Sequence, residues 1–365
     1  MSETFNIVQF LRSAVATGAS DEHLKVGQPP YIRKNGYIRK ISMDALSKED
    51  LDMAVLEIAP LSVRDAVLSM KDLDFMYEIK GCSRFRVNYN RQLGQPGLVI
   101  RNIPYGIPQL KDLSLPDVLN SVIDYQNGII LVTGPTGSGK STTLASLINE
   151  ISLRTSKHII TIEDPIEYVF NCQKSIISQR QVGVDTESFS DGIKYALRQD
   201  PDVIFIGEIR DKDTMAAALK AAETGHLVLS TLHTNDAVQT INRIINMFEE
   251  SNREIVRRQV ADTLRATIAQ KLVYSEAKQT RYPACEIMVV TSTIRDYIQK
   301  DNTEEIYELL ADNTIDDMVS MNISLARLAE AGLISQEEAL ASSNDENELE
   351  KIFRGVYQGT KSYYD

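Results

Sequence analysis

The residues best able to do chemistry form a glycine-rich run near the middle of the chain. The segment GPTGSGKS at positions 134–141 has the spacing G-x-x-x-x-G-K-S, and it lies between an apolar stretch and a helical one. Glycines let successive backbone N–H groups point into one concavity, which binds phosphate at the positive end of the following helix. The residues assigned to nucleotide binding are Gly134, Pro135, Thr136, Gly137, Ser138, Gly139, Lys140, Ser141 and Thr142.

The side chains of this run indicate which ligands it binds. Lys140 is expected to reach the β- and γ-phosphates, and Ser141 to offer its hydroxyl to Mg²⁺. The expected cofactors are therefore ATP and Mg²⁺.

Two acidic segments follow apolar runs further along the chain. TIEDPIEY at 161–168 places Glu163 where a general base could activate water, with Asp164 supporting the loop. A turn-capping Asp-Pro beside a solvated glutamate is the alternative. DVIFIGE at 202–208 ends in Glu208, a candidate ligand for Mg²⁺ or its water shell. Asp202 would lie about 20 Å away at the other end of that strand, too far to share the metal.

A histidine and an arginine are further candidates. His233 follows the apolar run HLVLSTL, where it could donate to a γ-phosphate and sense its loss, whereas His226 at the start of the run is expected to be structural. Arg210 could act at a subunit boundary or form a surface ion pair with Asp211 or Asp213.

Short apolar stretches alternate with helical ones around these motifs. This alternation predicts an α/β fold with a parallel sheet covered by helices on both faces. The stretch GIILV has no polar alternation, as expected of a strand whose two faces are both buried.

Residues 1–104 are expected to form a smaller α+β domain. YIRK-NG-YIRK at 31–40 predicts a hairpin with a two-residue turn, and 72–79, 83–90 and 97–104 alternate as strands do. Prolines and a glycine in 105–116 predict a linker. Residues 117–290 are expected to form the ATPase core, and residues 291–365 a helical region. The chain is expected to turn helical after Pro283, and the acidic stretch 342–350 to be a solvated connection.

Composition narrows the class of protein. The 365-residue chain has a formal net charge of −12, which argues against nucleic acid as the main partner. No apolar run approaches the roughly 18 residues of a membrane span, so a cytoplasmic location is expected. Three distant cysteines provide neither a disulfide framework nor a zinc site.

Four motifs carry a family resemblance. In order, GPTGSGKST, TIEDPIEY, DVIFIGEIRD and the block from GHLVLSTLHT to INRII resemble the Walker A, Asp box, Walker B and His box of secretion and pilus ATPases. The resemblance extends to the first domain through ASDEHLKVGQPPYIRKNG, SRFRVN and RNIP.

The resemblance implies a PAS-like N-terminal domain, a RecA-like C-terminal domain and a homohexamer with nucleotide between the two domains. It also implies that Arg86 and Arg101 reach the phosphates, with Arg84 a further candidate and a solvated strand the alternative for each. An inner-membrane pilus platform protein and a second related ATPase are the implied partners, which would place the chain at the inner face of the cytoplasmic membrane.

The expected function is a hexameric ATPase motor that couples hydrolysis to interdomain motion and powers type IV pilus retraction, the basis of twitching motility. Pilus-extension ATPases of this family usually carry a zinc-binding insert with four cysteines. This chain has no such insert, which favours retraction over assembly. TIRDYIQK at 293–300 departs from the AIRNLIRE motif of the retraction branch, so an accessory pilus ATPase or a secretion or conjugation ATPase stays an alternative. A P-loop kinase and a nucleic-acid translocase are the alternative functions from other classes of protein.

Overall fold

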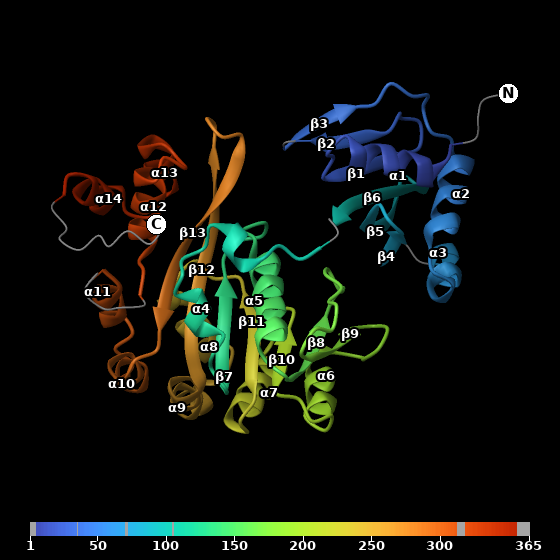
Figure 1. Ribbon diagram of the computed structural model, residues 1–365. Coiled ribbons are helices and arrows are strands. Elements are labelled where there is room, and N and C mark those ends of the chain that lie inside the picture. Colours follow the sequence, from blue (N-terminus) through green and yellow to red (C-terminus); the bar gives the residue numbers. More distant parts are fainter. Residues whose placement is uncertain (1–4, 35, 70–71, 104–105, 312–317, 356–365) are drawn as a thin grey trace. The chain divides into compact units, whose positions relative to one another are not determined.

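The computed structural model describes residues 5–34, 36–69, 72–103, 106–311 and 318–355, and the chain divides into two compact units. The first unit is Met1–Gly106 and the second is Ile107–Asp365. Each unit has its own hydrophobic core. Figure 1 labels helices and strands of both units.

An antiparallel sheet of six strands, ordered β3-β2-β1-β6-β5-β4, forms the first unit together with three helices. Burial alternates along β5 from Ser83 to Asn90, so that Phe85, Val87 and Tyr89 face the core while the intervening residues are partly exposed. The elements are α1 (Ile7–Ala16), β1 (Asp21–Lys25), β2 (Tyr31–Lys34), β3 (Tyr37–Lys40), α2 (Lys48–Ile58), α3 (Arg64–Ser69), β4 (Leu73–Ile79), β5 (Ser83–Gln92) and β6 (Gln95–Ile103).

The predicted hairpin at 31–40 is confirmed. Lys34 of β2 pairs with Tyr37 of β3, which leaves two residues for the turn. Gly36 has a φ of 84°, the positive value that such a turn requires, while Asn35 lies outside the described residues. Of the predicted linker 105–116, residue 105 also lies outside the described residues, Gly106 ends the first unit, and the part from Ile107 onward belongs to the second unit.

A sheet of seven strands, ordered β13-β12-β7-β11-β10-β8-β9, forms the centre of the second unit. The strands are β7 (Gly128–Thr133), β8 (His158–Glu163), β9 (Ile176–Gln181), β10 (Val203–Ile206), β11 (Leu227–Leu232), β12 (Leu264–Ser275) and β13 (Thr280–Val289). Strands β12, β7, β11, β10, β8 and β9 run parallel, and β13 is antiparallel to β12. The predicted α/β class is confirmed.

Helices cover both faces of this sheet (Figure 1). Alternate residues of β7 point to opposite faces, so Ile130 and Val132 join one core cluster while Ile129 and Leu131 join the other. One cluster includes α4 (Leu119–Val122), α5 (Lys140–Arg154), α12 (Met321–Glu330), α13 (Gln336–Ser342) and α14 (Glu346–Phe353). The other includes α6 (Phe189–Ala196), α7 (Lys212–Glu223), α8 (Ala237–Asn246), α9 (Arg253–Thr263), α10 (Ser292–Lys300) and α11 (Glu305–Ala311).

Two expectations about the C-terminal part were wrong. The chain does not turn helical after Pro283, because β13 continues through this residue to Val289. A proline is tolerated there since β13 is the edge strand of the sheet. Part of 342–350 is helical as well: Asp345 accepts a hydrogen bond from Glu348 N and caps α14, whose Leu349 is buried.

Two further observations concern membrane segments and thiols. Among the described residues, no helix is long and apolar enough to span a membrane. All three cysteines are free: Cys82 is half-buried, Cys172 is exposed and Cys285 is buried.

Leucines at two positions of α5 test the core of the second unit. Leu147 is fully buried whereas Leu153 is 39% exposed. Replacing Leu147 by Ala should lower the free energy of unfolding by about 2–5 kcal/mol, because a cavity remains where the side chain was. Leu153→Ala should cost much less. Urea unfolding of both variants measures the difference, and equal losses would contradict the burial of Leu147.

Candidate nucleotide-binding site

The glycine-rich run forms a loop between β7 and α5. Gly134, Gly137 and Gly139 have φ values of 136°, 80° and 92°, which residues with side chains rarely adopt. Lys140 is the first residue of α5, and its Nζ donates hydrogen bonds to the carbonyl oxygens of Gly134 at 2.8 Å and Pro135 at 2.9 Å. The loop therefore folds around a buried ammonium group.

The loop residues fit the phosphates of a nucleotide. Ser138 is buried, and its Oγ has no hydrogen-bond partner in the described part of the chain, as expected of a hydroxyl that a ligand satisfies. Burial lowers the pKa of Lys140, while the carboxylates of Glu208 and Glu167 act in the opposite direction. Anionic phosphate oxygens would supply further negative charge at this lysine.

Three of the predicted residues lie at the same edge of the sheet. Strands β7, β11, β10 and β8 are neighbours and parallel, so their carboxyl ends meet where ligands bind in such sheets. His233 follows β11, Glu208 lies two residues beyond β10, and Glu163 is the last residue of β8. The topology thus places them beside the phosphate loop.

Glu163 is a buried carboxyl group, only 5% exposed. Its Oε1 accepts hydrogen bonds from Thr161 Oγ1 at 2.7 Å and from Gln179 Nε2 at 3.2 Å. Burial raises the pKa of Glu163 to about 7, and these two hydrogen bonds oppose the rise. A carboxyl with this pKa is suited to accept a proton near neutral pH.

Glu208 connects the strand ends electrostatically. One carboxylate oxygen forms an ion pair with Arg210, and the other lies 3.6 Å from His233 Nε2. The hydrogen bond to Glu208 raises the pKa of Arg210. Of the two alternatives for Arg210, the surface ion pair with Asp211 or Asp213 is not found among the described residues, because Arg210 pairs with Glu208 and Asp211 caps α7 through Thr214 N.

Two of the predicted residues could bind a divalent cation together with a nucleotide. Ser141 is exposed in the first turn of α5, and Glu208 is close enough to Lys140 to influence its pKa. Within the described ranges no group of three or more His, Cys, Asp or Glu is arranged to hold a metal ion. The hydroxyl and carboxylate fit Mg²⁺ that also takes phosphate oxygens and water as ligands.

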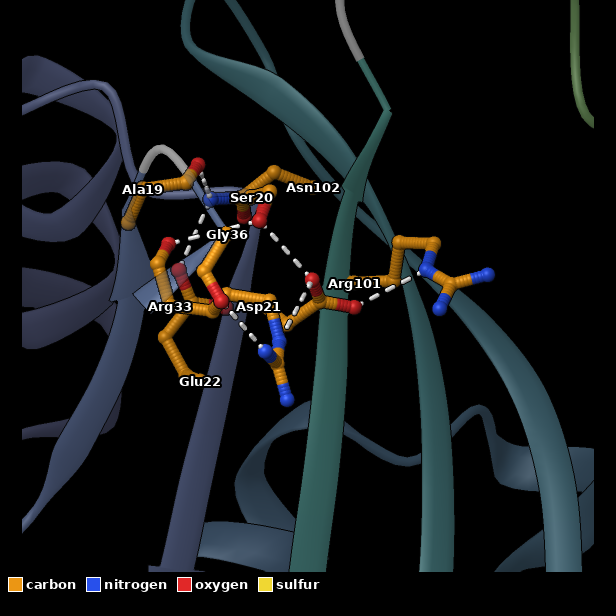
Figure 2. Close-up of polar contacts among 8 residues, drawn as sticks. All are labelled: Ala19, Ser20, Asp21, Glu22, Arg33, Gly36, Arg101 and Asn102. Atoms are coloured by element: carbon orange, nitrogen blue, oxygen red, sulfur yellow. Dashed lines mark hydrogen bonds and ion pairs between the residues drawn. The ribbon is translucent and has the colours of Figure 1, made fainter. Parts of the chain in front are cut away.

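The first unit presents its two predicted arginines at opposite positions of neighbouring strands. Arg86 of β5 pairs in register with Arg101 of β6, although like charges directly opposite each other are destabilising. Figure 2 shows how Asp21 offsets this: its Oδ1 accepts a hydrogen bond from Arg101 Nε at 2.9 Å, and its Oδ2 lies 4.0 Å from Arg33 Nε. The two Nη groups of Arg101 make no hydrogen bond within the described ranges.

Comparison with known proteins places this geometry in a family. The model of the family described as type II/IV secretion system protein matches residues 85–340. The chain belongs to this family. It is an ATPase of the type II/IV secretion family, as the sequence predicted.

Individual secretion-family ATPases resemble the chain over almost its whole length. The type IV pilus retraction ATPase PilT of Pseudomonas aeruginosa is 39% identical over 92% of this chain and 97% of its own. The pilus ATPase PilU of the same organism is 36% identical over 95% of this chain and 91% of its own. A crystal structure of the pilus retraction motor PilT with bound ADP matches with a TM-score of 0.87 and 41% identity, covering 95% of this chain and 99% of that one.

Sequence reasoning missed three polar residues around the site of this secretion-family ATPase. Tyr168 OH lies 3.1 Å from Thr142 Oγ1, so the acidic segment contacts the first turn of α5. Gln270 of β12 and Glu286 of β13 are buried within the sheet and hydrogen-bond to elements that carry the site. Tyr168 is the last residue of the TIEDPIEY motif. For Gln270 and Glu286 the only signal in the sequence is a polar residue within an apolar strand.

Substitutions of two glycines test the loop geometry. A Cβ on Gly134 would lie 2.2 Å from Gln270 O, whereas one on Gly137 would meet no atom within 4 Å. We expect Gly134→Ala to abolish binding of a fluorescent ADP analogue and Gly137→Ala to weaken it moderately, since only a positive φ opposes the second change. Equal affinities for the two variants would contradict the close approach of β12.

Proposed function

We propose that this chain is a ring-forming ATPase motor whose ATP hydrolysis powers retraction of a type IV pilus. The observation that carries the proposal is the convergence of Lys140, Glu163, Glu208 and His233 on one sheet edge, in a chain that resembles PilT over more than nine tenths of its length. A homohexamer at the inner face of the cytoplasmic membrane, bound to a pilus platform protein, is the assembly that this function requires.

Binding of ATP would exchange protein ligands for phosphate ligands. Lys140 leaves the loop carbonyls that it contacts and pairs with the β- and γ-phosphates. Ser141 and Glu208 would hold Mg²⁺, which neutralises charge on the phosphates. Arg210 and His233 keep Glu208 in place through its two oxygens.

Hydrolysis needs a base and a sensor at the γ-phosphate. Glu163 accepts a proton from the attacking water, since its raised pKa lies near neutral pH. His233, beside Glu208, donates to the γ-phosphate and loses this contact when the phosphate departs. Glu163 therefore acts in the hydrolysis step, and His233 responds to the departure of the γ-phosphate.

Arg86 and Arg101 are proposed to couple nucleotide state to motion of the first unit. The Nη groups of Arg101, which make no hydrogen bond to the described part of the chain, form a fork that suits phosphate oxygens, and phosphate charge relieves the repulsion between the two arginines. Loss of the γ-phosphate removes this attraction, so the first unit changes position relative to the second.

An accessory role in the same pilus machinery is the second candidate. The helix α10 carries TIRDYIQK at 293–300 in place of the motif AIRNLIRE expected of the retraction branch. The similarity to PilU also favours this reading, in which a second related ATPase supplies part of the force.

Deletion and complementation in the source organism test the direction of force. Loss of a retraction motor leaves pili on the cell surface and abolishes twitching, whereas loss of an assembly motor removes the pili. We expect abundant pili without twitching, restored by wild-type protein but not by Glu208→Ala. Loss of pili would overturn the retraction function, and unchanged twitching would favour the accessory role.

Turnover as a function of protein concentration tests the ring. We expect phosphate release, without any added acceptor, to rise steeply as the mass in solution reaches that of a hexamer. Glu208→Ala should lose turnover, while Glu249→Ala serves as a control because that glutamate is exposed and pairs with Lys212. Full activity in a dilute monomer would contradict the ring, and a requirement for an acceptor or for single-stranded DNA would favour a kinase or a translocase.

Glu163→Gln tests the base and its pH dependence. The variant should bind ATP normally while its turnover falls by about 10²–10⁴-fold, the range for loss of a general base. Wild-type turnover should fall as the pH decreases below about 7, because protonation of the raised carboxyl removes the base. Glu150→Gln, at an exposed ion pair of α5, should keep the wild-type profile. Turnover of Glu163→Gln at the wild-type rate would exclude this role.

A further inference from the structure

Gln270 of β12 forms a buried bridge between two parts of the phosphate-binding element. Gln270 is only 3% exposed, and its Nε2 donates a hydrogen bond to the carbonyl oxygen of Ser138 at 2.7 Å. Its Oε1 accepts from Thr143 Oγ1 in the first turn of α5 at 2.8 Å. One side chain therefore ties the loop to the helix that follows it.

The same strand explains why two loop positions are glycines. A Cβ on Gly134 would lie 2.2 Å from the main-chain oxygen of Gln270, and one on Gly139 would lie 2.7 Å from its Nε2. A Cβ carbon does not approach another heavy atom this closely, so β12 contacts the loop at both ends. The glycines provide space for the strand as well as the backbone conformation.

The paired strand makes a corresponding contact on the other face of the sheet. Glu286 of β13 lies opposite Ala269, the neighbour of Gln270, so its side chain points away from α5. Glu286 Oε1 accepts a hydrogen bond from Ala237 N at 2.8 Å, at the first residue of α8. Asp236 caps that helix through Gln239 N, and His233 lies three residues before this cap.

Resting on the nucleotide contacts proposed above, we infer that the hairpin of β12 and β13 sets the geometry of two loops: the phosphate loop at 134–139 and the loop at 233–236, here called the His233 loop. Gln270 is the positioning residue of the first and Glu286 that of the second. Gln270 must donate on one side and accept on the other, which an amide does and a carboxylate or an apolar side chain does not. Glu286 needs only to accept, so a glutamine should replace it.

Substitutions of Gln270 and Glu286 should affect ATP and ADP differently. In the proposed function, the backbone N–H groups of the phosphate loop contact phosphates that ATP and ADP share, whereas the His233 loop responds to the γ-phosphate alone. Displacing the first loop should weaken both nucleotides equally, and displacing the second should affect ATP turnover while leaving ADP affinity unchanged. A purely structural role would lower the melting temperature and leave the affinities of the folded protein as they are.

Nucleotide titration of the full chain tests Gln270. We expect Gln270→Met to weaken ATP and ADP alike by about tenfold, the loss of one buried hydrogen-bonded position. Thr143→Val removes the partner hydroxyl without changing side-chain volume, so it tests the bridge even where Gln270→Met does not fold, and about threefold weaker binding of both nucleotides is expected. Gln336→Met, at an exposed position of α13, is the control. Unchanged affinities in Thr143→Val, or a loss confined to ATP, would overturn the assignment.

Glu286 is tested by rescue. Glu286→Leu should lower kcat by about tenfold with unchanged ADP affinity, because Ala237 N loses its acceptor and the His233 loop shifts. Glu286→Gln should restore most of kcat, since its amide oxygen still accepts from Ala237 N. Equal kcat losses in both variants, or a matching loss of ADP affinity, would overturn the role of Glu286. Normal ATP turnover without pilus retraction in the wild type and in Glu286→Gln alike would instead count against the proposed pilus function.

Discussion

The second unit depends on burying one positive charge, that of Lys140, at the centre of its ligand-binding edge. An ammonium group removed from water requires compensation, which here comes from the carbonyl oxygens of Gly134 and Pro135 and from the field of Glu208. Glu208 is in turn held by Arg210, which lies in the same loop after β10, and by His233, which follows the neighbouring strand β11. The order of the strands therefore matters for catalysis, because it brings these charges within reach of one another.

The local parts of this arrangement could be predicted from the sequence, and the distant contacts could not. The phosphate loop and the strand ends follow from short motifs and from the rule that parallel strands end at a common edge. The bridge from Gln270 to Thr143 joins residues 127 positions apart, and the pair of Arg101 and Asp21 joins residues 80 apart. No local sequence pattern predicts contacts between residues so far apart in the chain.

The errors in the C-terminal part have a common physical origin. Pro283 and the acidic stretch before Leu349 were interpreted from residue type alone, whereas their neighbours decide the outcome. A proline costs no ladder hydrogen bond on the open side of an edge strand, and an acidic run forms a helix when a capping aspartate precedes it and an apolar stripe can be buried. Long apolar strands were predicted more reliably because their burial leaves few alternatives.

The distribution of the cysteines makes the chain suitable for site-selective labelling. Burial raises the pKa of Cys285 to about 12, so this thiol stays protonated and unreactive toward maleimides at neutral pH. Cys172 is exposed in the second unit, and Cys82 is half-buried in the first. Removing Cys82 or Cys172 in turn would leave a single reactive thiol in a chosen unit, and keeping both would allow a donor and an acceptor dye to report the distance between the units during turnover.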